Sequence, residues 1–314
     1  MPEPVGESPV QNRAIVWQGD IEAARHAGIP IVALESSVFA QGLPPPHNRE
    51  AHRLMCAAVR EAGAMPAVTA VVGGRASVGI SDATLKRFLT TGAPKVSARD
   101  LGWAIGARSD GATTVAAAIA IAAQAGIEVF ATGGIGGVHR GQAFDESADL
   151  LELARQPVIT VCAGAKSILD LPATVERLET FGVSVIGYRV DEFPGFFTAR
   201  TGIRLTTVAD SPAQIARAFL AGRAMGRSAG VLVVQPPPAD AALDAHTVDR
   251  AVVAAIREAD AAGVRGAAVT PFLLAAVDRA TNGASVRTNL ALLDANARLA
   301  GEIAVALAAE PARD

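Results

Sequence analysis

The chain has 314 residues, of which 50% are hydrophobic and 19% are charged, and its formal net charge is −3. This composition supports a large buried core and argues against intrinsic disorder. The 28 lysines and arginines are spread along the chain and form no basic block, so we expect no nucleic acid polymer as a partner.

The first 16 residues are expected to be a polar leader, and residues 17–314 a single domain, because no linker or internal repeat divides them. Residues 1–14 lead into no apolar stretch, and no apolar run approaches the roughly 18 residues of a spanning helix. We therefore expect a cytoplasmic protein without a membrane partner. Two cysteines, Cys56 and Cys162, lie in apolar surroundings and are predicted to be buried and structural.

Short apolar runs alternate with helical patterns along the chain. The first half predicts a strand at 30–34, a helix at 48–62, a strand at 67–72, a helix at 114–125 and a strand at 128–131. The second half predicts a helix at 147–155, a strand at 158–162, a helix at 173–180, strands at 183–187 and 230–234, and helices at 247–262, 271–280 and 288–309. Because the Val- and Ile-rich strands lack a polar face, we predict a three-layer α/β/α fold with a mostly parallel central sheet and a helical C-terminal region.

Ligands of an open parallel sheet bind where the strands end at their carboxyl edge, so residues just after predicted strands are candidate functional residues. Glu35, Thr132, Gly133 and Lys166 have this position. A partly desolvated carboxyl group can act as an acid near neutral pH, and lysines that form imines react as the neutral amine, which burial favours. Glu35 could instead serve as a turn or cap ligand, and Lys166 as a surface lysine.

A glycine-rich segment, residues 133–141, follows the strand at 128–131. Only glycines let backbone N–H groups approach a phosphate or sugar so closely. The segment meets the dinucleotide fingerprint G-x-G-x-x-G only loosely, and no helical pattern opens directly after it. It is therefore either a ligand cradle or an ordinary flexible turn.

The next segment places three acids and a hydroxyl at the start of a predicted helix: Asp145, Glu146, Ser147 and Asp149. Asp145 or Ser147 could cap that helix, or the carboxylates could bind a divalent cation, since Mg²⁺ or Mn²⁺ uses only one or two carboxylates plus waters. The five histidines form no closely spaced pair, so any metal is expected to be a hard, oxygen-ligated ion.

Two further segments carry groups that could hold an anion. Lys95 offers a point charge to a phosphate but could equally be a solvated surface lysine. Residues 111–115 open a predicted helix with Thr113 and Thr114, which could bind an anion at the helix N-terminus or simply cap it.

Taken together, these segments resemble the pseudouridine-5′-phosphate glycosidase family, also called indigoidine synthase A-like proteins. The resemblance runs from about residue 17 to 308, with motifs in the family's order at 33–37, 95–97, 111–115, 132–141, 145–150, 163–167 and 191–194. One loop departs from the family: relatives usually have Glu-Ser-Thr and His-Gly-Met/Leu-Pro where this chain has Glu35-Ser36-Ser37 and Gln41-Gly42-Leu43-Pro44.

The resemblance implies an enzyme that reversibly cleaves the carbon–carbon glycosidic bond of pseudouridine 5′-phosphate to give uracil and ribose 5-phosphate. It implies Lys166 as the imine-forming nucleophile, Glu35 as the proton donor, and Asp145 as the ligand of one Mn²⁺ or other divalent cation per subunit. A homotrimer is implied as well. The implied substrate contacts are Lys95, Val115, Thr132, His139, Ser147, Ala148, Asp149 and Asn289.

Two other interpretations stay open from the residues. Another imine-forming lyase, acting on a different sugar phosphate, would keep Lys166 but would not need uracil. A nucleotide-binding module could use the glycine segment without any chemistry, although it has no need of Glu35, Asp145 and Lys166 together.

Overall fold

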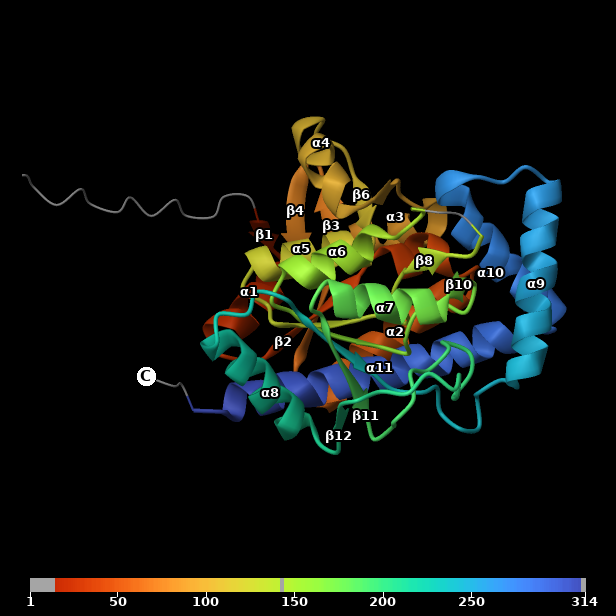
Figure 1. The fold of residues 1–314 in the computed structure, drawn as a ribbon. Helices are drawn as coiled ribbons and strands as arrows, with labels where there is room; N and C mark the ends of the chain where they lie inside the picture. The colour runs from red at the N-terminus through yellow and green to blue at the C-terminus, as the bar shows by residue number, and fades with distance from the viewer. Residues whose placement is uncertain (1–14, 142–143, 312–314) are drawn as a thin grey trace, which may run out of the picture.

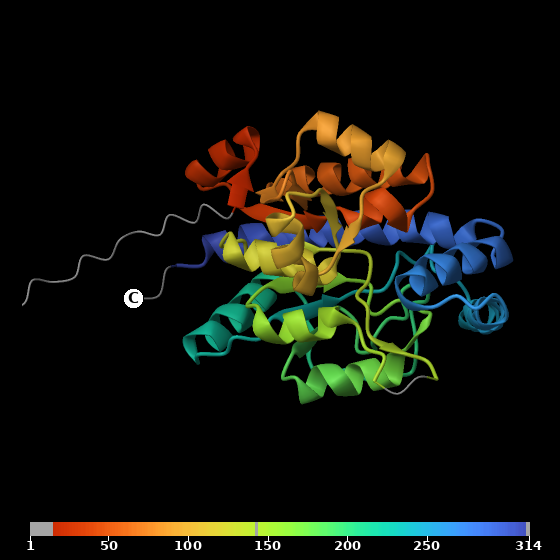
Figure 2. The same ribbon diagram turned by 90° about the horizontal axis from the view of Figure 1, so that it is seen from above.

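The computed structural model describes residues 15–141 and 144–311. Helices cover both faces of one extended β-sheet, as Figures 1 and 2 show. The predicted three-layer α/β/α fold is therefore confirmed. Of the expected leader, residues 1–14 lie outside the described residues, while residues 15 and 16 belong to the first strand.

The central sheet has a long parallel region with an antiparallel extension at one side. Its order is β1 (Ile15–Trp17), β4 (Arg75–Val78), β3 (Met65–Val72), β2 (Ile31–Glu35), β7 (Val129–Ala131), β9 (Ile159–Cys162), β13 (Val231–Val234), β11 (Ser184–Tyr188) and β12 (Val208–Ala209). Every neighbouring pair from β3 to β12 is parallel, whereas β4 runs antiparallel to β3. Strands β7, β9 and β13 are buried throughout, as helices on both faces require.

Two groups of helices form the outer layers. Helix α5 (Val115–Gln124) packs on β2 and β7 and contacts α6 (Ala148–Arg155), which in turn contacts α7 (Leu171–Thr180). On the opposite face, α11 (Ala284–Ala309) packs on β7 and β9 and against α2 (His47–Glu61) and α8 (Pro212–Ala224). Figure 2 shows α11 running along the length of the molecule.

The remaining elements lie around this core. Helices α1 (Gly19–His26), α3 (Asp82–Thr91) and α4 (Leu101–Gly106) belong to the N-terminal half, where β5 (Lys95–Val96) pairs with β6 (Gly111–Thr113). Helices α9 (Ala245–Ala261) and α10 (Val269–Ala280) pack together at one end of the molecule (Figure 1). Two short strands, β8 (Val138–His139) and β10 (Leu169–Asp170), form a separate antiparallel pair. The C-terminal region is helical, as predicted.

Each predicted strand and helix is found within a few residues of its expected bounds. Helices α1, α3, α4 and α8 were not predicted, although α3 and α8 carry a serine cap. Ser81 accepts from the Thr84 amide at 3.3 Å, and Ser211, directly before Pro212, accepts from the Gln214 amide at 3.4 Å. A serine followed by proline at the first helical position is a helix-start signal that identifies α8.

Both cysteines are buried and free, as predicted. Burial raises the pKa of the Cys56 thiol to about 11 and that of the Cys162 thiol to about 12, so neither is a ready nucleophile.

Among the described helices, none combines the length and the apolar character needed to cross a membrane.

Candidate active site

Three neighbouring parallel strands bring three predicted site residues to one edge of the sheet. Glu35 is the last residue of β2, Thr132 directly follows β7, and Lys166 lies four residues after β9. Since β2, β7 and β9 are adjacent and parallel, these residues meet at the carboxyl edge, as expected. The Thr132 hydroxyl donates a 2.5 Å hydrogen bond to Glu35 Oε1.

A cavity of about 420 Å³ opens at this edge. Most of the predicted site residues line it: Glu35, Lys95, Val115, His139, Asp145, Ser147, Ala148, Asp149 and Lys166. Thr132 and Asn289 do not. Thr132 instead contacts Glu35, and Asn289 Oδ1 would lie 3.3 Å from a Cβ atom added to Gly133. Thr132 therefore holds a residue of the cavity wall, and Asn289 lies beside Gly133 at the start of the glycine loop.

Glu35 is a buried carboxyl group, with only 4% of its surface exposed. Two hydroxyls hold it, because Ser37 Oγ donates to Oε2 at 2.6 Å and Thr132 donates to Oε1. Burial raises the pKa of Glu35 against the lowering effects of Lys166 and of these two donors. A carboxyl group that keeps its proton above the ordinary range can act as a general acid nearer neutral pH.

Two lysines share the cavity with carboxylates. Lys166 is partly buried, and its Nζ donates a 2.7 Å hydrogen bond to the Gly134 carbonyl. Lys95 lines the cavity from β5. Burial lowers the pKa of Lys95, and the charge of Lys166 lowers it further, while Glu35 and Asp149 oppose both effects. The lysine side chains offer positive groups that could hold the phosphate of a phosphorylated ligand.

The glycine loop, residues 133–137, continues the pairing of β7 with β9 beyond the sheet. The amide of Ala163 donates to the Gly133 carbonyl at 2.9 Å, and the amide of Ile135 donates to the Gly164 carbonyl at 3.1 Å. The amide of Lys166 then donates to the Ile135 carbonyl at 3.1 Å. The loop therefore sets the position of the Lys166 backbone.

Close packing requires glycine at three positions of this loop. A Cβ atom would lie 2.6 Å from the Phe196 ring at Gly134, 2.3 Å from Ser147 Oγ at Gly136, and 2.3 Å from Thr174 Oγ1 at Gly137. These distances are shorter than van der Waals contact, so no side chain fits without rearrangement. The segment is thus a tightly packed loop and not an ordinary flexible turn.

Asp149 clamps the glycine loop to helix α5. Its Oδ1 accepts from the Ala116 amide at 2.9 Å, and its Oδ2 accepts from the Gly136 amide at 2.8 Å. The side chain is almost fully buried, and each carboxylate oxygen has a backbone donor. Asp149 therefore joins the N-terminus of α5 to the loop beside Lys166.

Asn296, a residue that the sequence analysis missed, holds the loop from the other side. Its Nδ2 donates to the carbonyls of Thr132 at 2.9 Å and Gly133 at 3.3 Å, and its Oδ1 accepts from Gln235 at 3.0 Å. Asn296 is fully buried on α11. The available signal was a polar residue at a core position of an otherwise apolar helix face.

Both helix starts at the cavity are capped, so the capping interpretations are confirmed. Thr114 accepts from the Ala117 amide at 3.4 Å at the start of α5. Ser147 accepts from the Asp149 amide at 3.2 Å at the start of α6. Both caps also line the cavity, where two positive helix ends therefore converge.

Asp145 and His139 offer donors that fit a divalent cation. Asp145 Oδ1 lies 3.3 Å from His139 Nδ1, and the Asp145 side chain is 51% exposed. Glu146 is engaged elsewhere, in an ion pair with Arg177 at 2.9 Å. The described residues contain no cluster of three or more metal-ligating side chains. The Asp145 carboxylate, completed by water or substrate oxygens, is the kind of oxygen ligand that a Mn²⁺-type ion takes.

The cavity wall also includes residues that the sequence analysis did not single out as site residues. Polar groups come from Ser37, Gln41, Ser97 and Arg99, and an apolar wall comes from α10, with Val269, Pro271 and Leu274. The helical pattern of α10 predicts an apolar face but does not say that this face covers the site.

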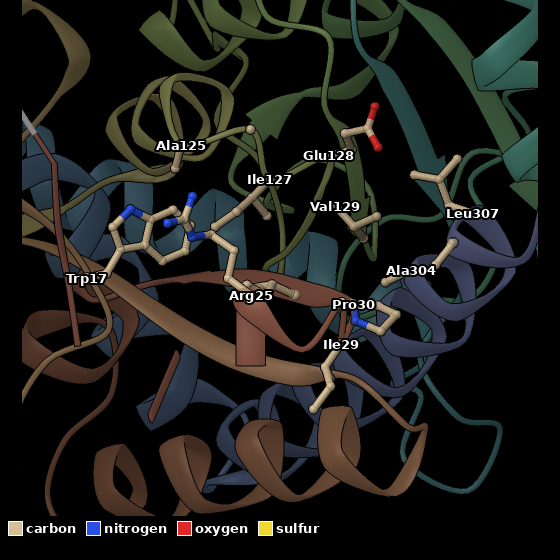
Figure 3. Close-up of a pocket in the computed structure, with 14 residues that line it drawn as sticks. Trp17, Arg25, Ile29, Pro30, Ala125, Ile127, Glu128, Val129, Ala304 and Leu307 are labelled. Carbon is tan, nitrogen blue, oxygen red and sulfur yellow. The ribbon is translucent and has the colours of Figure 1, made fainter. Parts of the chain in front are cut away.

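A smaller cavity of about 250 Å³ lies at the opposite, amino edge of the sheet (Figure 3). The Arg25 guanidinium lies 4.8 Å from the centre of the Trp17 ring there. Arg25 and Glu128 are the ionisable residues in its lining, which is otherwise mostly apolar. The carboxyl edge, with its two lysines and several carboxylates, is therefore the candidate active site.

The fold and site define a class of protein: a three-layer α/β protein with a lysine and a buried carboxyl group in one cavity at the carboxyl edge of its sheet. A family model described as indigoidine synthase A like protein matches residues 20–306. The chain belongs to the indigoidine synthase A-like family.

Relatives of similar length support this assignment. The chain is 62% identical to the pseudouridine-5′-phosphate glycosidase of Gemmatimonas aurantiaca, over 90% of this chain and 93% of that protein. It is 53% identical to the protein of the same name from Herpetosiphon aurantiacus, over 93% of this chain and 98% of that protein.

Two solved structures share the fold over nearly their whole length. A prealnumycin C-glycosynthase in complex with ribulose 5-phosphate is 40% identical, with a TM-score of 0.88 and coverage of 95% of this chain and 98% of that chain. An indigoidine synthase A-like protein from Thermotoga maritima is 35% identical, with a TM-score of 0.86 and coverage of 94% of this chain and 96% of that chain.

Glu35→Gln is expected to stabilise the protein more at pH 8 than at pH 4. The pKa of Glu35 is raised in the folded state, so wild-type stability falls as pH rises from about 4.3 through that raised pKa. A neutral glutamine removes this loss. Urea unfolding at pH 4 and pH 8 measures the free energy of unfolding of wild type and Glu35→Gln. Glu258→Gln, at an exposed ion pair, is the control. A difference between wild type and Glu35→Gln that is the same at both pH values would contradict the assignment.

Asp149→Asn should lower the free energy of unfolding by about 1–3 kcal/mol, because its amide NH₂ would face a backbone donor. The control is Asp249→Asn, at a residue whose side chain is 67% exposed, which should change stability by less than about 0.5 kcal/mol. Equal effects in chemical denaturation would show that Asp149 is not a clamp.

Proposed function

We propose that the chain is a pseudouridine-5′-phosphate glycosidase, which reversibly converts pseudouridine 5′-phosphate and water into uracil and ribose 5-phosphate. The observation that carries this proposal is the presence of Lys166 and the buried Glu35 in one cavity at the carboxyl edge. The relatives that bear this name, at 62% and 53% identity, support the choice of substrate.

The substrate requires unusual chemistry, because its glycosidic bond joins two carbon atoms. No leaving oxygen or nitrogen can be protonated, as it is in ordinary glycoside hydrolysis. A lysine amine offers an alternative, since its nitrogen can supply the electrons that a breaking carbon–carbon bond needs.

Lys166 and Glu35 divide this chemistry between them. Glu35 gives a proton to the ring oxygen of the ribose while Lys166 Nζ bonds to C1′, and the ring opens. Protonation of the uracil C5 atom then lets the bond between C1′ and C5 break. The nitrogen lone pair forms an imine as uracil leaves, and water hydrolyses the imine to release ribose 5-phosphate and the free amine.

The remaining cavity residues bind the substrate. Lys95 provides a positive charge for the phosphate, and the starts of α5 and α6 provide the positive ends of two helices. Substrate contacts are assigned to Val115, at the start of α5, and to Ser147, Ala148 and Asp149, at the start of α6. His139 lines the same cavity and is assigned as a further substrate contact, with its Nδ1 3.3 Å from Asp145 Oδ1. Thr132 and Asn289 act from behind the wall, through Glu35 and Gly133.

One divalent cation of the Mn²⁺ type is proposed at Asp145, with His139 beside it. Such an ion orients and polarises oxygen ligands when it is bound. The two neighbouring acids have other tasks, because Glu146 pairs with Arg177 and Asp149 accepts from two backbone amides.

The likeness to a C-glycosynthase supports a reversible reaction, because a site that breaks a carbon–carbon glycosidic bond also forms one. A lyase for a different sugar phosphate would keep Lys166 and release another product. Uracil in the product mixture therefore separates the two functions.

Borohydride should trap ribose 5-phosphate on Lys166. The chain has three lysines, Lys86, Lys95 and Lys166, so the labelled position is assigned directly by peptide mass spectrometry. Lys86→Arg, at an exposed position of α3, is the control and should be labelled like the wild type. Lys166→Arg should be unlabelled and release no uracil; a labelled Lys166→Arg protein would refute the covalent role.

Asp145→Asn is expected to raise the Mn²⁺ concentration for half-maximal uracil release by about 10-fold or more. Asp191→Asn, at an exposed ion pair, should leave this concentration unchanged. Full activity of the wild type after removal of all divalent cations by a chelator would overturn the metal assignment.

A cytoplasmic homotrimer is proposed on the family resemblance. Sedimentation equilibrium of the purified protein is expected to give three times the mass of the chain. A single-chain mass across micromolar concentrations would contradict a trimer.

A further inference from the structure

Three buried hydroxyl side chains form a cluster behind the cavity wall. Ser36, Thr69 and Thr113 come from the residue after β2, from β3 and from β6, and each has at most 1% of its surface exposed. Thr113 is at the centre, because its Oγ1 lies 2.9 Å from Thr69 Oγ1 and 3.2 Å from Ser36 Oγ. It also donates to the Thr69 carbonyl at 2.8 Å. The cluster therefore joins three segments at the carboxyl end of β2.

The contact between Ser36 and Thr113 is reciprocal. The Thr113 amide donates to Ser36 Oγ at 2.9 Å, and the Ser36 amide donates to Thr113 Oγ1 at 3.3 Å. Ser36 directly follows Glu35, and Thr113 is the last residue of β6, one residue before the Thr114 cap of α5. Thr113 therefore connects the backbone beside Glu35 to the start of α5.

Hydroxyls hold the Glu35 backbone on both sides. Thr69 Oγ1 donates to the carbonyl of Leu34, directly before Glu35, at 3.1 Å. Thr113 Oγ1 accepts from the amide of Ser36, directly after Glu35. The pairing of β2 with β3 reaches no further than Glu35, so strand pairing does not fix the turn that follows. The position of Glu35 relative to α5 therefore depends on these hydroxyls.

Packing alone does not explain a hydroxyl at position 113. Valine has nearly the shape of threonine, and the neighbouring residues of β3 and β6 are small or apolar: Ala70, Val71 and Ala112. Burying a hydroxyl costs free energy unless it is hydrogen-bonded, and a fully bonded network fixes one arrangement of the groups that it joins. The cluster therefore selects one position for the turn that carries Glu35.

We propose that Thr113 is a positioning residue that keeps the proton donor Glu35 aligned with the start of α5, where substrate contacts lie. This inference rests on the proposed function. The start of α5 has independent support, because the Thr114 hydroxyl caps it and Asp149 accepts from the Ala116 amide. Loss of the Thr113 hydroxyl should therefore displace Glu35 more than the groups that bind the substrate. A displaced acid transfers its proton more slowly.

Steady-state kinetics of uracil release test this role. Thr113→Val keeps the shape of the side chain without its hydroxyl, so kcat should fall about 10-fold or more while KM stays within about threefold. Thr113→Ser keeps the hydroxyl and should restore most of kcat. Thr160→Val is the matched control, because Thr160 is a fully buried threonine of β9 whose hydroxyl has no hydrogen-bond partner among the described residues. Its kinetic constants should equal those of the wild type.

A second variant covers the case in which Thr113→Val does not fold. Ser36→Ala removes the same reciprocal contact from the other side and should give the same fall in kcat with little change in KM. Complete borohydride labelling of Lys166 by ribose 5-phosphate counts the intact sites of each variant, so that kcat is expressed per site.

Three outcomes would overturn the inference. A kcat per site within about twofold of the wild type in Ser36→Ala and in any folded Thr113→Val would show that the contact only supports the fold. A lower kcat that Thr113→Ser does not restore would assign the effect to packing. A higher KM without a lower kcat would assign Thr113 to substrate binding. Wild-type protein that releases no uracil would refute the proposed function itself, and this inference with it, whereas the outcomes above refute the inference alone.

Discussion

The close contact between the glycine loop and the segment that carries Lys166 is the constraint on which the site depends. Backbone hydrogen bonds join the two segments, and the Gly134 carbonyl also accepts from Lys166 Nζ. Any side chain at Gly134 or Gly136 would push the segments away from their neighbours. Asp149 and Asn296 hold the loop from opposite sides. Lys166 is therefore placed by rigid backbone and not by its own flexible side chain.

The carboxyl groups of the site differ because their surroundings differ. Glu35 is buried and accepts hydrogen bonds from two hydroxyls. Burial outweighs the lowering effect of these donors and of Lys166, so the pKa of Glu35 is raised and it is suited to give a proton. Asp149 is equally enclosed, but each of its oxygens accepts from a backbone amide, which suits a structural clamp. Asp145 remains half exposed beside His139, where a cation can reach it. A raised pKa at Glu35 reduces stability at neutral pH, which is a common property of functional groups.

Local patterns and the geometry of parallel sheets make the fold and the meeting of Glu35 with Lys166 predictable from the sequence. Residues that come after adjacent parallel strands must share one edge of the sheet. Asn296, Gln41 and the wall formed by α10 could not be predicted, because their partners lie far away in the chain and depend on tertiary packing. Ser147 shows a further limit: it both caps α6 and lines the cavity, and a sequence pattern cannot reveal that one residue has both roles.

The most direct test of the account is a crystal structure of the protein soaked with ribose 5-phosphate. The account predicts continuous density between Lys166 Nζ and C1 of an open-chain sugar, with the phosphate beside Lys95 and the start of α5. A sugar phosphate bound elsewhere, or bound at this cavity in closed form with no link to Lys166, would contradict the central role of this lysine.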